Sequence, residues 1–258
     1  MTLGIIGVGT IAAAIVEGLH SASAGCAIVL SPRNEQRALF LASQFAEVRV
    51  APTNQAVLDA SEIVLIAVRP QIAFDVLPEL RFRPDHRVVS LIPAVTLGYL
   101  RDITAPACSV TRAVPLPSAA RGQSPTSMYP PNPSLKALFE RLGVVIELDR
   151  EEEFETFTAA TAIMSSYFRI AETVVVWMQR EGVSEAKAHA FVSHMLLGLA
   201  GAAAASPQSS FAELTEEHQT RGGLNEQVLQ SITAAGVFAE LDNALDGVLV
   251  RLVAGRPK

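Results

Sequence analysis

The stretch Leu3–Leu19 constrains the fold more than any other part of this sequence. Its first four residues are apolar, as in a buried strand, and they run into Gly-Val-Gly-Thr-Ile-Ala, which opens an apolar helix. Glycines between a strand and a helix allow a tight turn and leave the first N–H groups of the helix open to an anion. The stretch therefore predicts a turn that binds the pyrophosphate of a dinucleotide, although an ordinary glycine-rich turn has the same pattern. The residues expected at the pyrophosphate are Gly7, Gly9, Thr10 and Ile11.

A second apolar run, Cys26–Leu30, ends where the ribose of a bound dinucleotide would lie. A carboxylate at this position would accept hydrogen bonds from the ribose of NAD and repel a 2′-phosphate. This chain instead offers a hydroxyl, a guanidinium and an amide, from Ser31, Arg33 and Asn34. The sequence thus predicts that NADP(H) is preferred over NAD(H), unless Arg33 is only a solvated surface residue.

Residues 1–150 alternate apolar runs with helical stretches, which is typical of an α/β fold with a Rossmann-like, doubly wound parallel sheet. Two strands end in arginines, Ile63–Val68 before Arg69-Pro70 and Ser109–Arg112 at its own last residue. Ligands of such sheets bind at the carboxyl ends of the strands. The proline-containing segment that continues to Tyr129 is expected to be a loop, either a wall of the substrate pocket or a stiffened connection. The other expected strands are Arg49–Val50, Val88–Ile92 and Val144–Glu147.

The second part of the chain, residues 151–258, is expected to be an all-helical dimerisation domain. Phe154–Gln179 and Glu185–Ala205 are apolar on too much of their circumference to be solvated alone, which predicts burial against other helices and a homodimer. Further on, Arg221-Gly222-Gly223 opens another helix that contains Asn225. An anion such as a substrate carboxylate could bind these N–H groups, and a bare helix start fits equally well.

Composition excludes several classes of partner and cofactor. The net charge is −6 and the sequence has no basic run, so nucleic acid is not expected as a partner. Cys26 and Cys108 have no disulfide or zinc spacing, and both are expected to be buried thiols in a reducing cytoplasm. No positive charge precedes Arg33, which argues against a secretion signal, and Phe191–Ala205 is too short to cross a membrane. We therefore expect a cytoplasmic protein without a metal or a membrane partner.

The motifs of this chain, in their order and spacing, resemble those of pyrroline-5-carboxylate reductases. The resemblance implies a cofactor domain over 1–150, a helical dimerisation domain over 151–258, and a substrate pocket shared across the dimer. The motifs that carry it are the glycine turn with Asn54, Ala67-Val68-Arg69-Pro70-Gln71, Ser90 through Leu97, Arg112-Ala113-Val114-Pro115 and Gly222-Gly223. The cofactor contacts that it implies are Asn54, Ala67, Val68, Arg69, Pro70 and Arg112. The residues expected to bind the substrate at the second helix start are Arg221, Gly222, Gly223 and Asn225, of which the resemblance covers the two glycines.

The chain departs from the family pattern at three places near the expected pocket. Residues 115–118 read Pro-Leu-Pro-Ser for the family's Pro-Asn-Thr-Pro, and residues 220–225 read Thr-Arg-Gly-Gly-Leu-Asn for its Ser-Pro-Gly-Gly-Thr-Thr. Residues around Ile163–Ser166 replace its Gly-Ser-Gly-Pro-Ala. Three functions stay open: an NADPH-dependent reductase of a cyclic imine carboxylate in L-proline-type biosynthesis, a reductase of another imine or ketone, and a dinucleotide-binding sensor without turnover.

Reduction of a C=N bond makes few chemical demands on the protein. An imine can arrive already protonated near neutral pH, so orienting substrate and cofactor is the main task. Tyr167 and His218 are possible proton donors, although a lone tyrosine or histidine more often serves packing or lies on the surface.

Overall fold

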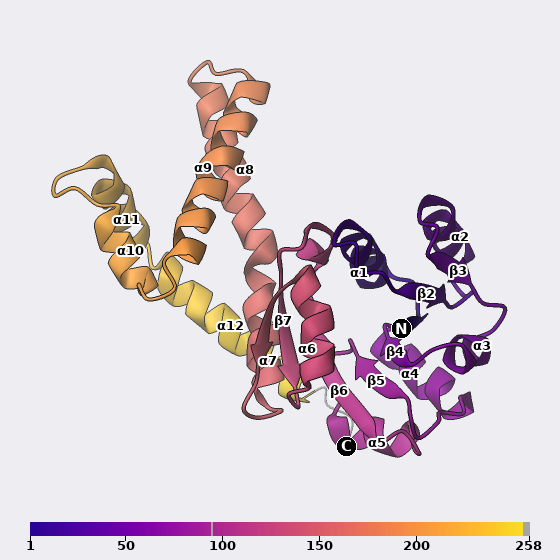
Figure 1. The fold of residues 1–258 in the computed structure, drawn as a ribbon. Coiled ribbons are helices and arrows are strands. Elements are labelled where there is room, and N and C mark those ends of the chain that lie inside the picture. The colour runs from indigo at the N-terminus through magenta and orange to yellow at the C-terminus, as the bar shows by residue number, and fades with distance from the viewer. Residues whose placement is uncertain (94, 255–258) are drawn as a thin grey trace. The chain divides into compact units, whose positions relative to one another are not determined.

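The computed structural model describes residues 1–93 and 95–254, which form two compact units (Figure 1). The first unit comprises Met1–Thr158 together with the residues from Leu252 onward, and the second comprises Ala159–Arg251. The last four residues of the predicted helical domain, 255–258, lie outside the described residues.

The first unit is built on an eight-stranded sheet with strand order β3-β2-β1-β4-β5-β6-β7-β8. Neighbouring strands are parallel except β6 and β7, which pair antiparallel. The predicted doubly wound, mostly parallel sheet is thus confirmed. The strands are β1 Thr2–Ile6, β2 Ala27–Leu30, β3 Val48–Val50, β4 Ile63–Ile66, β5 Arg87–Ser90, β6 Ser109–Val114, β7 Ser124–Tyr129 and β8 Gly143–Glu147.

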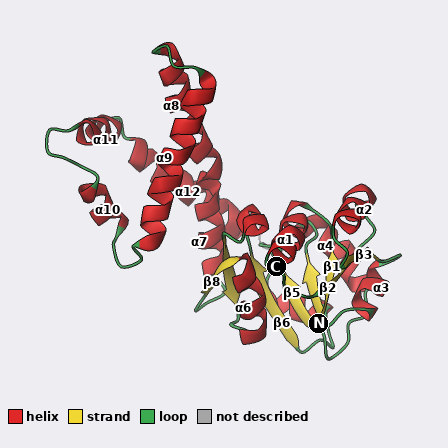
Figure 2. Cartoon of the chain, turned by 45° about the horizontal axis from the view of Figure 1, so that its top comes forward, coloured by secondary structure: helices red, strands yellow, loops and turns green. Residues whose placement is uncertain are grey.

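Helices cover both faces of the sheet, and an apolar layer fills the space on each side (Figure 2). In β4, Ile63 and Leu65 belong to one layer whereas Val64 and Ile66 belong to the other, because successive side chains point to opposite faces. The helices of this unit are α1 Thr10–Ser21, α2 Glu35–Gln44, α3 Asn54–Asp59, α4 Pro70–Val76, α5 Leu97–Ile103, α6 Pro133–Phe139 and, as far as Thr158, α7 Glu153–Ala160. Short 3₁₀ turns lie at Leu77–Glu79, Pro117–Arg121 and Glu140–Leu142.

Strand β7 was not expected from the sequence, because the prolines in this segment predict a loop. The strand pairs with β6 only from Ser127 to Tyr129 and with β8 from Ser124 to Met128. Pro125 therefore lies beyond the β6 pairing, near the start of the strand, where the missing N–H of proline is tolerated. The prediction of a loop wall along the whole segment is wrong for these six residues.

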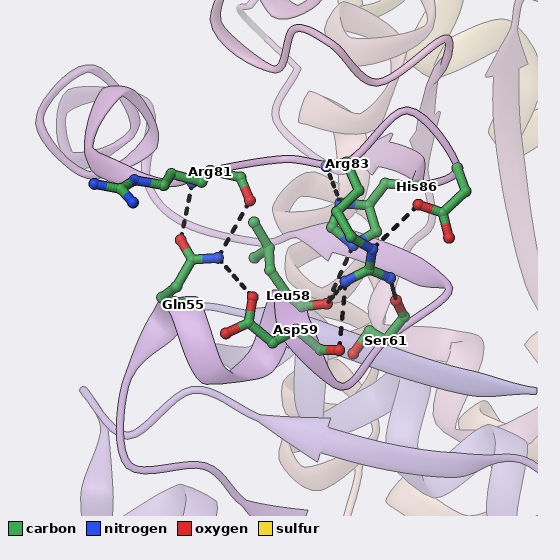
Figure 3. Close-up of polar contacts among 8 residues, drawn as sticks. Gln55, Leu58, Asp59, Ser61, Arg81, Arg83 and His86 are labelled. Carbon is green, nitrogen blue, oxygen red and sulfur yellow. Dashed lines mark hydrogen bonds and ion pairs between the residues drawn. The ribbon is translucent and has the colours of Figure 1, made fainter.

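A polar cluster fixes α3 against the amino-terminal ends of β4 and β5 (Figure 3). The guanidinium of Arg83 donates hydrogen bonds to the carbonyl oxygens of Leu58, Asp59 and Ser61 at 3.1, 3.3 and 2.9 Å. The ring of His86 accepts from the Arg83 amide at 3.0 Å and donates to the Leu58 carbonyl at 3.1 Å. Burial is the main cause that lowers the pKa of His86. This cluster is structural, since ligands of open α/β sheets bind at the opposite edge.

The second unit is entirely helical within its described residues. A 3₁₀ turn at Thr161–Ile163 divides the helix expected over Phe154–Gln179, whereas α9 has the bounds that the sequence predicted. Only Val175, Ala188 and Val192 form a buried apolar cluster here. The helices are α8 Met164–Arg180, α9 Glu185–Ala205, α10 Phe211–Glu217, α11 Leu224–Ala234 and α12 Val237–Ala254, the last of which continues into the first unit.

Large apolar side chains are exposed over the helices of this second unit. Phe168 is 69% exposed, Trp177 is 52% exposed and Phe191 is 61% exposed. The expectation that α9 is buried between helices therefore does not hold within one chain. Helix α9 is long and apolar enough to span a bilayer by length and composition. One helix of this kind is weak evidence for a membrane-spanning segment. Apolar faces of this extent indicate an interface.

Candidate functional site

The glycine turn between β1 and α1 is shaped to receive an anion. Gly7 has φ +95°, and a Cβ atom there would lie 2.8 Å from the carbonyl oxygen of Ala67, so only glycine fits. Gly9 is the N-cap of α1 and receives no side-chain cap. A Cβ atom on Gly9 would meet no described atom within 4 Å, so that side of the turn is open. The first N–H groups of a twelve-residue helix thus face a region that a pyrophosphate could occupy.

Two residues expected at the cofactor, Ser31 and Asn34, support this turn from the end of β2. The Ser31 hydroxyl accepts a hydrogen bond from the Gly7 amide at 2.8 Å, and this side chain is almost completely buried. The Asn34 side chain donates to the Val8 carbonyl at 2.9 Å. The structure gives both residues a supporting role that the sequence analysis missed, and their direct contact with a 2′-phosphate stays a prediction.

Arg33, by contrast, is exposed in the turn before α2, and a second arginine lies close by. Arg37 is in the first turn of α2, with its Nη1 atom 3.5 Å from the Thr10 hydroxyl at the start of α1. Among the described residues, no carboxylate forms an ion pair with either guanidinium. Sequence reasoning missed Arg37, although its spacing of four from Arg33 on a helix start was the available signal.

The carboxyl end of β4 brings further expected residues to the same edge. The Ala67 amide donates to the Ile6 carbonyl at 2.8 Å, which places Ala67 and Val68 beside the glycine turn. Arg69 is exposed and is the N-cap of α4, whose first residue is Pro70. Asn54 begins α3 beyond β3, two strands away from β1, and is half-buried.

The side chain of Arg112 is buried, and its expected contact with a cofactor stays a prediction. It is 1% exposed and lies 2.6 Å from the Glu151 carboxylate. The guanidinium also donates to the Pro93 carbonyl and lies 4.2 Å from the ring centroid of Phe154. Glu151, its acidic partner, was not recognised in the sequence because it lies 39 residues away along the chain.

In the second unit, the double glycine does open a helix, α11. Gly222 has φ +74° and Gly223 is the N-cap. The Gly222 amide donates to the carboxylate of Glu226 at 2.5 Å, so one of the N–H groups expected to bind a substrate anion already has an internal carboxylate partner. Arg221 is exposed beside this helix start.

A cavity of about 490 Å³ lies within the second unit and contains several of the expected residues. Tyr167, His218 and Asn225 line it together, and the Asn225 side chain donates to the His218 carbonyl at 2.7 Å. The rest of the lining is mostly apolar and comes from α9, α10 and α11: Leu196, Leu199, Ala200, Ala202, Ala203, Phe211, Leu214 and Leu229. Such a lining suits an apolar side chain better than a small polar substrate.

The described residues contain no group of three His, Cys, Asp or Glu side chains that could hold a metal ion. Both cysteines are free; Cys26 is buried as expected, whereas Cys108 is exposed, contrary to expectation. Burial is the main cause that raises the pKa of the Cys26 thiol.

Two protein-family models match the chain. Residues 2–93 match the family described as "NADP oxidoreductase coenzyme F420-dependent", and residues 151–252 match "Pyrroline-5-carboxylate reductase dimerisation". A pyrroline-5-carboxylate reductase of Synechocystis sp. is 31% identical over 156 residues, which span 57% of this chain and 58% of that protein. One from Methanosarcina acetivorans is 24% identical over 94% of this chain and 93% of its own length.

Solved structures share the fold over almost the whole chain. The 1-pyrroline-5-carboxylate reductase of Streptococcus pyogenes matches with a TM-score of 0.84 and 23% identity, covering 98% of both chains. The pyrroline carboxylate reductase of Plasmodium falciparum, solved with NADP bound, has a TM-score of 0.84 and 16% identity, covering 98% of this chain and 97% of its own.

Proposed function

The chain belongs to the pyrroline-5-carboxylate reductase family, and we propose that it uses NADPH to reduce the C=N bond of a cyclic imine carboxylate, as in L-proline-type biosynthesis. The observation that carries the proposal is the open glycine turn at the carboxyl edge of a parallel sheet. We further propose that the protein acts in the cytoplasm, where both free cysteines stay reduced.

We propose that the first unit holds NADPH across the carboxyl ends of its strands. The N–H groups at the start of α1, near Gly9, would bind the pyrophosphate. Arg33 and Arg37 would bind the 2′-phosphate, since both guanidinium groups are exposed beside the turn. Ala67 and Val68, after β4, would then lie under the nicotinamide half. The bound cofactor supplies a hydride.

The chain's own residues then have two tasks, to orient the imine and to exclude water from it. A protonated imine needs no acid from the protein, so positioning is the main requirement. The exposed guanidinium of Arg221 beside the α11 start is the strongest candidate for binding the substrate carboxylate. Because Glu226 already accepts from the Gly222 amide, we assign the carboxylate to Arg221 rather than to that amide.

Self-association is part of the proposal. The second unit matches a dimerisation family and exposes large apolar side chains on most of its helices. We propose that two copies bury these faces against each other over more than about 2,000 Å², as obligate dimers do. Sedimentation at micromolar concentration should show a dimer or a larger assembly, and a well-folded monomer would contradict this part of the proposal.

The activity can be tested by following NADPH oxidation with a panel of substrates. We expect the five-membered imine carboxylate to react with kcat/KM about 10-fold or more above that of the same imine without its carboxylate, since one charge-assisted contact is lost. Arg221→Gln should raise KM for the carboxylated imine only. Arg180→Gln, which removes an exposed arginine elsewhere in the second unit, is the matched control.

The other functions predict different outcomes of the same panel. Turnover of an uncharged imine or a ketone in preference to the imine carboxylate would indicate a different reductase on this fold. Tight binding of NADPH with no turnover of any substrate would indicate a sensor.

A further inference from the structure

The buried ion pair between Arg112 and Glu151 holds more than its own two side chains. The Arg112 guanidinium donates through Nη1 to Glu151 at 2.6 Å and through Nη2 to the Pro93 carbonyl. The Phe154 ring lies against it, with its centroid 4.2 Å from Cζ. A buried guanidinium with partners in fixed directions has little freedom to turn, because losing a partner would leave its charge uncompensated.

Glu151 binds the backbone a few residues further along, at the start of α5. Its Oε1 atom, besides pairing with Arg112, accepts a hydrogen bond from the Leu97 amide at 2.5 Å. Pro93 lies three residues after the end of β5, and Leu97 is the first residue of α5. The ion pair therefore closes a ring: the arginine holds the Pro93 carbonyl, the glutamate holds the Leu97 amide, and each holds the other. We call this arrangement the Arg112–Glu151 clasp.

The position of the clasp relates it to the nicotinamide half of the cofactor site. The glycine turn follows β1, and the sheet runs from β2 through β1 and β4 to β5. A dinucleotide whose adenosine half lies over the end of β2 extends in the other direction, over the ends of β4 and β5. The β5–α5 connection follows β5 at this edge, and Ser90 of β5 is paired with both Ile66 of β4 and Arg112 of β6.

We propose that Arg112 and Glu151 are positioning residues, which hold the Pro93 carbonyl and the Leu97 amide beside the place that the nicotinamide ring takes for hydride transfer. The inference rests on the proposed function, and it gives Arg112 a role without contact to the cofactor. A loosened clasp should leave the adenosine half bound as before while the reacting atoms lose alignment. Misplacement of about 1 Å is enough to lower a rate about 100-fold.

Two conservative variants test the proposal. Glu151→Gln keeps an oxygen acceptor for Leu97 but removes the charge, and Arg112→Lys keeps the charge but removes the second donor to Pro93. Glu147→Gln is the matched control, because Glu147 forms an ion pair with Lys136 at 2.5 Å in the same unit. For each protein, kcat, KM for the imine, the melting temperature, and Kd for NADPH and for 2′-phospho-ADP-ribose, which lacks nicotinamide, would be measured.

We expect kcat to fall about 10- to 100-fold in Glu151→Gln and less in Arg112→Lys. The Kd for 2′-phospho-ADP-ribose should stay within about twofold of the unmodified value, and Glu147→Gln should behave as the unmodified protein in every assay. An unchanged kcat in folded Glu151→Gln, or an equal loss of affinity for NADPH and 2′-phospho-ADP-ribose, would overturn the proposal. Should Glu151→Gln fail to fold, Arg112→Lys is judged by the same criteria.

A failure of the proposed function is distinguishable from a failure of the clasp. If the unmodified protein binds NADPH but reduces no imine, the proposed function fails. The clasp is then judged by the ratio of the two Kd values. The proposal is supported if Glu151→Gln loses the extra affinity that the unmodified protein has for NADPH over 2′-phospho-ADP-ribose. It is overturned if the ratio of these two Kd values is unchanged.

Discussion

Replacement of Arg33 by aspartate should weaken the preference of this protein for NADPH. No carboxylate of the described residues pairs with Arg33 or Arg37, so a 2′-phosphate would not have to displace an existing partner. Both side chains are exposed, so each charge-assisted contact is placed at the lower end of the usual range, about 1.5 kcal/mol. Two such contacts amount to about 3 kcal/mol, or a preference of about 100-fold for NADPH over NADH.

The variant removes one of these contacts and adds a negative charge. NADPH should therefore bind about 10-fold or more weakly to Arg33→Asp, whereas NADH should bind at least as well, since a carboxylate accepts hydrogen bonds from ribose hydroxyls. Fluorescence titration of both cofactors measures the two affinities. Arg49→Asp is the matched control, because it makes the same charge change at an exposed position on β3.

Two results would refute this reasoning. One is an unmodified protein that binds NADPH and NADH equally well. The other is a folded Arg33→Asp variant that keeps the original ratio, which would make Arg33 a surface residue without a role in cofactor choice.

Three further predictions concern the glycine turn, the packing of α1 and the buried histidine. Gly9→Val should weaken NADPH and NADH alike with the melting temperature unchanged, because its Cβ atom would meet no described protein atom but would stand where the pyrophosphate binds; normal cofactor titrations would contradict this. Gly18→Ala should destabilise the protein by about 1–3 kcal/mol in urea unfolding, since the new Cβ atom would lie 2.1 Å from the Ala119 carbonyl, whereas Gly98→Ala, in open space, should not. The lowered pKa of His86 means that its contribution to stability is complete above 6.5, its value in the unfolded chain, and is lost as the pH falls from there through the folded pKa. The urea midpoint should thus change less between about pH 7.5 and about pH 5.5 in His86→Gln than in the unmodified protein. An equal change in the two proteins would count against a buried neutral histidine.

The sequence predicted the parts of the fold that depend on local patterns. The strand, turn and helix between Leu3 and Leu19 were predictable because apolar runs and glycines act within a few residues. Helix α9 was predicted with its observed bounds for the same reason. Strand β7 was missed because it pairs with β6 over only three residues and contains Pro125, so its pattern is that of a turn.

The candidate site was harder to predict because its contacts join distant residues. The sequence places Arg112 at the end of a strand as a cation for a ligand, and in the structure it forms a buried ion pair with Glu151, 39 residues away. Likewise, Ser31 hydrogen-bonds Gly7 from 24 residues away, so a polar residue in the expected position supports the turn. A motif indicates which residue types meet near a ligand, whereas the direction of each side chain depends on partners that the motif does not contain.

The transfer of a hydride to an imine is the central claim, and it can be followed atom by atom. NADPH carrying deuterium at both hydrogen positions of C4 in the reduced nicotinamide, incubated with the protein and the five-membered imine carboxylate, should yield a saturated cyclic amino acid. Mass spectrometry should find one deuterium on the carbon that was double-bonded to nitrogen. Stable binding of NADPH with no deuterium in the product of any imine would contradict the account.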